Sequence, residues 1–314
     1  PDPAPEPTPP AAPVPGRRAR HWAPAGVLRG HSDLVHSVAF SPDGTLLVAA
    51  GADTTIRIWE MPGGKPLGVL RARSAGYPEA LAFSPDGTML AAGNSDSTIR
   101  LWNPLTRKHI DVLTGHTGPV RAVAFHPDGT VLASGGDDNT VRLWDPATGK
   151  PIALLEGHTG DVRAMAFSPN GALLATGGTD DTVRLWDLDT RKSSVLTGHE
   201  HDVDTVAFSP NGALLATGSQ DDTVRLWDVR TRKTIAVLTE HTDDVYAVAF
   251  SPNGALLATG SWDDTVRLWD VRTKKPTAVL TEHTDDVRSV AFHPDGILLA
   301  TAGSDLIVRL WRPA

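Results

Sequence analysis

Cysteine is absent from the 314 residues. This absence excludes a disulfide framework and any thiolate metal site, and it fits the cytoplasm, although an exported domain without disulfides is also compatible with it. No apolar run approaches the roughly 20 residues that a membrane-spanning helix needs, and no signal peptide is visible, so we expect no membrane insertion. Basic residues are not in excess either, because the formal net charge is −8. Since a basic patch normally drives binding to nucleic acid, we expect no nucleic-acid partner.

The first 22 residues contain almost no large apolar side chain. Eight of the first 15 residues are proline. Such a segment cannot build a core, and we predict an extended, semi-rigid linker over residues 1–22. Arg17, Arg18 and Arg20 within it are expected to be solvated surface. The chain begins with Pro1, not Met, and we interpret it as a fragment or processed form of a longer protein.

The rest of the chain repeats one unit seven times, typified by residues 157–186. The Trp that closes each copy lies 41 to 43 residues from the next, and an Asp stands six residues before each of them. In six copies a His also lies 28 residues before the Trp. A fixed period in this range indicates a repeat architecture, in which each unit buries its apolar face against its neighbours. We therefore expect one domain, not two.

Each repeat predicts four short β-strands. In the fourth copy these are residues 162–167, 172–176, 182–186 and a weaker strand ending at Leu196. A turn of Pro followed by Asn-Gly or Asp-Gly separates the first two strands in every repeat, and such turns favour hairpins. Pro66, Pro151 and Pro276 begin the fourth strand in three repeats. Because proline is tolerated on edge strands, the fourth strand is predicted to be the outer one.

The repeats are predicted to close into a ring. Residues 25–28 resemble the fourth strand of a repeat, whereas the chain ends three residues after Trp311, before the last repeat has its own copy. An N-terminal strand beside the C-terminal three completes the last unit. The predicted fold is an all-β, seven-bladed β-propeller over residues 23–314. Its blades are expected at about residues 34–70, 79–113, 120–155, 162–196, 203–238, 245–280 and 287–311 plus 23–28.

The repeat resembles the WD40 repeat. The resemblance rests on Gly-His, an Asp in the turn and a closing Trp-Asp, as in Gly157-His158, Asp180 and Trp186-Asp187, and it covers about residues 23–312. The Asp of Trp-Asp is present in four repeats, at Asp145, Asp187, Asp228 and Asp270. Glu60, Asn103 and Arg312 replace it in the others.

The recurring polar residues permit two interpretations. A Ser or Thr, a His and an Asp could form a catalytic triad. However, an active site is normally built once, and the resemblance to the WD40 family implies instead a buried tetrad in which Asp, His, hydroxyl and Trp indole are hydrogen-bonded. The expected tetrads are His116, Asp138, Ser134 and Trp144; His158, Asp180, Thr176 and Trp186; His199, Asp221, Thr217 and Trp227; His241, Asp263, Thr259 and Trp269; and His283, Asp305, Thr301 and Trp311.

Repeats one and two depart from this pattern. Ala49 and Ala92 stand where the other repeats have a hydroxyl, and repeat two also lacks Gly-His, reading residues 71–77 instead. We predict that blades one and two are the less stable sector.

No metal, cofactor or catalytic residue is predicted. The six recurring histidines belong to different blades and are not expected to converge. His126 and His293 replace Ser in a turn, while His36, His109 and His201 are expected on the exposed surface. No phosphate-binding loop is present, and no cluster of unique acids or metal ligands is apparent on one side of the ring.

Function is expected where the copies disagree. One variable position follows the leading apolar residue of the first strand: His36, Glu79, Arg121, Arg163, Asp204, Tyr246 and Arg288. The other precedes the turn Asp: Ala52, Ser95, Asp137, Thr179, Gln220, Trp262 and Ser304. Resemblance to WD40 partner sites implies that both lie at one rim. Trp262 is the outlier, and aromatic residues with Arg are enriched at binding hot spots, although the indole could also lie flat across its own blade.

These observations predict a non-catalytic, monomeric scaffold that binds a protein or peptide on one face. The predicted partner-binding residues are Trp262, Tyr246, Arg121, Arg163, Arg288, His36 and Asp204. The flanking acids Asp161, Asp202, Asp244 and Asp286 make the rim mixed in sign, which favours a peptide or protein ligand. The alternative is a small-ligand or enzymatic site at the central channel. The composition also resembles the WD40 part of actinobacterial serine/threonine kinases of the PkwA type, which implies a domain that recruits partners for a kinase.

Overall fold

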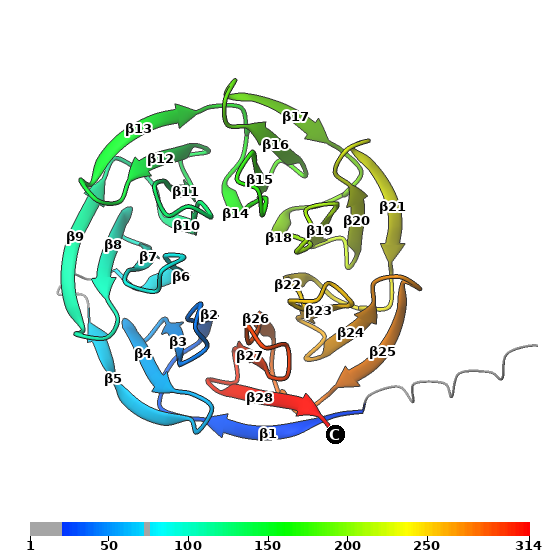
Figure 1. The fold of residues 1–314 in the computed structure, drawn as a ribbon. Coiled ribbons are helices and arrows are strands. Elements are labelled where there is room, and N and C mark those ends of the chain that lie inside the picture. The colour runs from blue at the N-terminus through cyan, green and yellow to red at the C-terminus, as the bar shows by residue number, and fades with distance from the viewer. Residues whose placement is uncertain (1–20, 72–75) are drawn as a thin grey trace, which may run out of the picture.

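A computed structural model describes residues 21–71 and 76–314. These residues form seven four-stranded antiparallel sheets arranged radially around a central axis (Figure 1). The seven-bladed, all-β propeller predicted from the repeat is therefore confirmed. Except for residues 21 and 22, the predicted linker and its arginines lie outside the described residues.

The strands of blades one to six follow the sequence order. Blade one comprises β2 (Val35–Phe40), β3 (Leu46–Gly51), β4 (Thr55–Glu60) and β5 (Lys65–Arg71), and blade two comprises β6 (Pro78–Phe83), β7 (Leu90–Asn94), β8 (Thr98–Asn103) and β9 (Lys108–Thr114). Blade three comprises β10 (Val120–Phe125), β11 (Leu132–Gly136), β12 (Val141–Asp145) and β13 (Lys150–Leu155), and blade four comprises β14 (Val162–Phe167), β15 (Leu173–Gly178), β16 (Val183–Asp187) and β17 (Lys192–Leu196). Blade five comprises β18 (Val203–Phe208), β19 (Leu214–Ser219), β20 (Val224–Asp228) and β21 (Lys233–Leu238), and blade six comprises β22 (Val245–Phe250), β23 (Leu256–Ser261), β24 (Val266–Asp270) and β25 (Lys275–Leu280).

Blade seven joins the two ends of the described chain. It comprises β26 (Val287–Phe292), β27 (Leu299–Gly303), β28 (Val308–Pro313) and the N-terminal β1 (Trp22–Leu28). Strand β1 pairs antiparallel with β28, from Trp22 opposite Pro313 to Leu28 opposite Val308. Figure 1 shows this closure, with blue β1 lying along red β28. The prediction that an N-terminal strand completes the last blade is confirmed.

The first strand of each blade lies at the channel and the fourth lies at the periphery (Figure 1). The peripheral position explains why Pro66, Pro151 and Pro276 are tolerated, since an outer edge strand has a free hydrogen-bonding side. The second and third strands of blade four begin at Leu173 and Val183, one residue later than predicted, because the residues before them belong to the turns.

The core is distributed between neighbouring blades. One cluster, for example, packs Val224 and Leu226 of blade five against Val245, Leu257 and Trp269 of blade six. A blade alone would leave these side chains in water, so each sheet depends on its neighbour. Strand β1 completes blade seven, so the apolar side chains of this blade are also removed from water.

The turns between first and second strands have a recurring hydrogen-bond pattern. In blade four the hydroxyl of Ser168 accepts from the amide of Leu173, and Gly171 adopts a positive φ of 73°. In blade three the equivalent of Ser168 is His126, whose Nε2 lies 3.1 Å from the carbonyl oxygen of Gly171 in the next blade. His293 similarly contacts the carbonyl oxygen of Gly44 at 3.0 Å. These two histidines therefore link adjacent blades, a role beyond simple replacement of serine in a turn.

Candidate functional site

The recurring polar residues form closed hydrogen-bond networks in blades three to seven. In blade four the Nδ1 of His158 lies 2.9 Å from Asp180, its Nε2 lies 2.7 Å from Oγ1 of Thr176, and Nε1 of Trp186 lies 2.9 Å from the same hydroxyl. The other four networks have the same connectivity. They join Asp138, His116, Ser134 and Trp144; Asp221, His199, Thr217 and Trp227; Asp263, His241, Thr259 and Trp269; and Asp305, His283, Thr301 and Trp311.

The donors in each network follow from the chemistry of its members. An indole N–H can only donate, so the hydroxyl accepts from Trp186 and donates its own proton to Nε2 of His158. The imidazole then carries its proton on Nδ1 and donates it to Asp180. Burial lowers the pKa of His158 and favours this neutral form.

The networks are structural because their hydroxyls are inaccessible. Thr176 is completely buried, and the Trp186 indole already occupies its hydroxyl oxygen. A nucleophile must reach a substrate carbonyl, which this hydroxyl cannot do. The arrangement resembles a Ser-His-Asp triad in connectivity only.

Blades one and two contain incomplete versions of the network. In blade one His31 lies 3.1 Å from Asp53, but Ala49 offers no hydroxyl and Nε2 of His31 is buried without a hydrogen-bond partner among the described residues. In blade two Arg100 forms an ion pair with Asp96, with 2.7 Å between Nη2 and Oδ2. Blade two also leaves the buried Nε1 of Trp102 unpartnered within the described part of the chain.

A cavity of about 340 Å³ opens at the centre of the ring. The second residue of each innermost strand lines it. These seven residues, here called the channel mouth, are His36, Glu79, Arg121, Arg163, Asp204, Tyr246 and Arg288.

A β-bulge explains how each blade presents its channel-mouth residue. In blade four Val162 pairs with Gly178 and Ala164 pairs with Gly177, which leaves Arg163 as the extra residue. The same register shift occurs at this position in all seven blades. A bulge re-aims a side chain without ending the strand, and here it lets one residue per blade face the channel. His36 is one of them, so the expectation that it lies on the exposed surface is wrong, whereas His109 and His201 are exposed.

The two variable positions of a blade contact each other in four blades. The guanidinium of Arg121 donates to both carboxylate oxygens of Asp137, and the Nε2 of Gln220 donates to Asp204. Tyr246 stacks on Trp262, and Arg288 donates to Ser304. Each pair is separated by 16 residues.

On the side of the channel mouth formed by blades two and three, the charged side chains are paired with one another. The guanidinium of Arg121 lies 2.6 Å from Glu79 and 2.7 Å from Asp137. His36 stacks on Tyr77 at a centroid distance of 5.5 Å. Burial, with the nearby cations Arg288 and Arg121, lowers the pKa of His36 to about 4, so its imidazole is neutral at pH 7.

On the side formed by blades four and five, the charged side chains are farther apart. The guanidinium of Arg163 lies 3.7 Å from Asp204, 3.9 Å from Asp202 and 4.0 Å from Asp161. These contacts are ion pairs but too long for hydrogen bonds. Burial raises the pKa of Asp204 to about 6.

Blades six and seven contribute an aromatic stack to the rim. The rings of Tyr246 and Trp262 are 4.8 Å apart and nearly parallel, and the Arg288 guanidinium lies 5.7 Å and 5.4 Å from their centroids. Burial raises the pKa of Tyr246 and keeps its phenol protonated. Nε1 of Trp262 is buried without a hydrogen-bond partner among the described residues. The indole does lie across its own blade, yet its polar atom is left unsatisfied.

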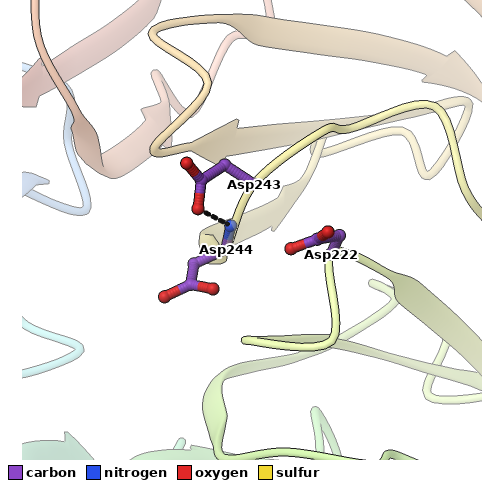
Figure 2. A group of neighbouring side chains, drawn as sticks. All are labelled: Asp222, Asp243 and Asp244. Atoms are coloured by element: carbon purple, nitrogen blue, oxygen red, sulfur yellow. Dashed lines mark hydrogen bonds between the residues drawn. The ribbon is translucent and has the colours of Figure 1, made fainter.

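Two groups of three aspartates, here called carboxylate triads, lie at the same end of the propeller as the channel mouth. One, formed by Asp222, Asp243 and Asp244, is drawn in Figure 2; its ligand oxygens lie within 4.8 Å of one another. The other contains Asp264, Asp285 and Asp286.

These triads were not anticipated from the sequence, and because they recur at two successive blade connections they are not a cluster of acids unique to one place in the ring. Sequence reasoning missed them because the turn acid comes from one blade and the Asp-Asp pair from the connection to the next. Burial and the neighbouring Asp243 and Asp222 raise the pKa of Asp244 to about 6. Hard cations prefer such oxygens, but exposed acids often gather without an ion, and no buried unpartnered side-chain atom of the described residues belongs to either triad.

No helix able to cross a membrane occurs in residues 21–71 and 76–314.

Comparisons with known proteins agree with this fold. The family described as WDR19 first beta-propeller matches residues 121–282, and the WD domain, G-beta repeat matches residues 22–60, 64–103 and 274–312. A 49-residue segment is 51% identical to an uncharacterized WD repeat-containing protein, sll1491, of Synechocystis sp., and covers 15% of this chain. A 37-residue segment is 49% identical to a probable cytosolic iron-sulfur protein assembly protein, a CIAO1 homolog, of Ixodes scapularis, and covers 12% of this chain.

The matched segments span 14% and 12% of those two proteins. The WDR19-type match alone covers more than half of the chain, and the WD matches lie on either side of it. Together with the seven closed sheets, these matches show that the chain belongs to the WD40-repeat family of seven-bladed β-propellers.

Proposed function

We propose that this propeller is a non-catalytic scaffold that binds a protein or peptide at the channel mouth and the adjoining rim of Trp262. WD40 propellers commonly bind proteins. The supporting observation is the bulge in every blade, which presents one side chain of variable type to a common cavity while the framework around it stays nearly constant. Tyr246, Trp262 and Arg288 supply the aromatic and guanidinium surface that is enriched at binding hot spots. Arg121, Arg163, His36 and Asp204 complete the proposed contact set.

A small ligand in the channel is the second candidate, because a cavity of about 340 Å³ has the size of a ligand pocket. Small-molecule pockets are mostly apolar, whereas charged and polar side chains dominate this channel mouth. This chemistry favours an extended polar partner.

The larger context is a separate proposal. On the resemblance to kinases of the PkwA type, we propose that the propeller recruits substrates or partners for an enzyme in the same protein. The support for this is sequence resemblance, and it does not affect the location of the binding surface.

A comparative pull-down with mass spectrometry tests the binding proposal. Wild type is compared with the Trp262→Ala/Tyr246→Ala double variant and with Leu105→Ala/Ile297→Ala, which removes two exposed apolar side chains from turns at the opposite end. A partner retained by wild type and by the opposite-end control but lost by the first variant supports the proposal. A partner that binds all three equally excludes this surface.

A further inference from the structure

The two sides of the channel mouth differ in how their charged groups are paired. The side of Glu79 and Arg121 is here called the closed side, and the side of Arg163 and Asp204 is called the open side. On the closed side the Arg121 guanidinium donates to three carboxylate oxygens, both of Asp137 and Oε1 of Glu79, at 2.6 to 2.8 Å. On the open side two buried polar atoms, Nε of Arg163 and Oδ1 of Asp204, have no hydrogen-bond partner among the described residues. The closed side also leaves one such atom, Nε2 of the neutral His36, so within the described residues the unsatisfied atoms of charged side chains at the channel mouth lie on the open side.

Asp204 is the most unusual group on the open side. Its side chain is only 3% exposed, and its Oδ2 accepts a hydrogen bond of 2.9 Å from Gln220. Its Oδ1 accepts no hydrogen bond from the described residues, and Nη1 of Arg163 lies 3.7 Å from it. Buried carboxylates are normally fully hydrogen-bonded, and an unpaired oxygen is costly. Because Asp204 lines the cavity, a donor arriving there would satisfy it.

The local charge specifies what kind of donor fits. One guanidinium, that of Arg163, lies among the carboxylates of Asp161, Asp202 and Asp204. Asp244 adds a further negative charge that acts on Asp204. The open side therefore has more negative than positive charge, although the chain as a whole presents both signs at the rim. An incoming cation would lower this repulsion, and an incoming anion would increase it.

The neighbouring side chains hold Asp204 in place. Gln220 donates from one amide nitrogen to Asp204 and lies 3.3 Å from the hydroxyl of Tyr246. The stack of Tyr246 on Trp262 fixes the phenol in turn. The carboxylate is thus preorganised at the wall of the cavity, which reduces the entropic cost of binding.

We propose that a basic side chain of the partner, lysine or arginine, enters the channel mouth and donates a hydrogen bond to Oδ1 of Asp204. The inference deepens the proposed function and rests on it, because it specifies the chemistry of one contact within that surface. The rim of mixed charge led us to expect a partner that carries both charges. The proposal instead specifies a basic side chain of the partner as its contact on the open side.

Selection from a random dodecapeptide phage library on the immobilised full chain provides a probe of known composition. Selected peptides are synthesised, and their Kd is measured by fluorescence anisotropy on wild type, Asp204→Asn and Asp189→Asn. Asp189 is an exposed acid in a turn at the opposite end of the propeller and serves as the matched control. We expect the peptides to share a Lys or Arg whose replacement by Gln weakens binding to wild type and to Asp189→Asn at least tenfold. The same replacement should have almost no effect on binding to Asp204→Asn.

The outcomes separate this inference from the function on which it rests. Peptides that bind without a shared basic residue, yet lose affinity for Trp262→Ala/Tyr246→Ala, overturn the basic anchor and leave the binding surface intact. Peptides indifferent to that double variant overturn the proposed surface itself, as does failure to select any peptide. Should Asp204→Asn not fold, Lys→Glu in the selected peptide decides the matter on wild type: unchanged affinity contradicts the proposal.

Discussion

Tyr246 and Trp262 stack face to face, with ring centroids 4.8 Å apart and planes within 10° of parallel. Both belong to blade six, and they occupy the two variable positions where other blades have polar or charged pairs such as Arg121 with Asp137. The stack accounts for the indole packing but not for its Nε1, which is buried without a partner in the described structure. Buried indole N–H groups are normally hydrogen-bonded, so Nε1 of Trp262 is an exception to that rule.

Removing a tetrad hydroxyl should lower stability. Thr176→Val keeps the shape of the side chain but deprives His158 and Trp186 of their shared partner. Two buried polar atoms become unsatisfied, and we expect the free energy of unfolding to fall by about 1 to 3 kcal/mol. Urea denaturation measures this loss. Thr281→Val, at an exposed site, is the control and should change stability by less than about 0.5 kcal/mol.

Completing the tetrad of blade one should raise stability. Ala49→Ser places a hydroxyl where Ser134 stands in blade three and gives the unpartnered Nε2 of His31 a donor. We expect a gain of about 1 kcal/mol in the free energy of unfolding. The matched control is Ala50→Ser, which buries a hydroxyl in the apolar cluster that contains Val48, Ile56 and Ile58 and should destabilise. If both variants lose stability equally, His31 is not the limiting group.

Hydrogen exchange should be fastest in blades one and two. Each leaves one nitrogen of its incomplete tetrad buried without a partner among the described residues, Nε2 of His31 in blade one and Nε1 of Trp102 in blade two, while the tetrads of blades three to seven are complete. Opening of β4 and β8 should therefore cost about 1 to 3 kcal/mol less than opening of β16 and β20. Native-state exchange followed by mass spectrometry measures the difference, and equal protection of all four strands would contradict it.

Asp204→Asn should raise stability in a pH-dependent manner. Arg163, Asp202, Asp244 and Tyr246 face this carboxyl, and burial is the main cause of its raised pKa of about 6, against 3.8 in an unperturbed carboxyl. Between these two values the folded chain binds a proton that the unfolded chain has released, so wild-type stability falls as pH rises from about 4 to about 6. Above about pH 6 the folded wild type carries the full cost of burying an ionised carboxylate, whereas the neutral amide in the variant Asp204→Asn does not have this cost.

The difference in unfolding free energy between Asp204→Asn and wild type should grow from about pH 4 to pH 7 and reach about 2 to 3 kcal/mol. Urea unfolding at unit steps of pH provides the comparison. A difference that stays constant across this range would show that Asp204 does not titrate in the folded chain with a raised pKa.

The fold was predictable because its determinants recur along the chain. The period of the Trp residues, the Pro-Asn-Gly turns and the strand-like residues 25–28 each specify a local or closing feature. Thr176 and its equivalents were recognisable for the same reason: seven copies distinguish residues kept for packing from residues that vary.

Features that depend on geometry between strands or blades were not predictable. The bulge that turns Arg163 and His36 into the channel leaves no mark in the sequence beyond a break in alternation. Asp222 meets Asp243 and Asp244 only because neighbouring blades lie side by side. The spacing of 16 residues within the pairs of variable positions was a usable signal, since Asp137 compensates Arg121 in charge at that distance along the chain.

The most direct test of the account measures stability and affinity together for Thr176→Val and Trp262→Ala, with a peptide selected on wild type. Recurring residues should serve the scaffold, and residues individual to one blade should serve the partner. We therefore expect folded Thr176→Val to be less stable but to keep its Kd within about twofold, whereas Trp262→Ala loses affinity at least tenfold, or about 1.4 kcal/mol. Unchanged affinity in Trp262→Ala, or an equal loss in both variants while fully folded, would contradict this expectation.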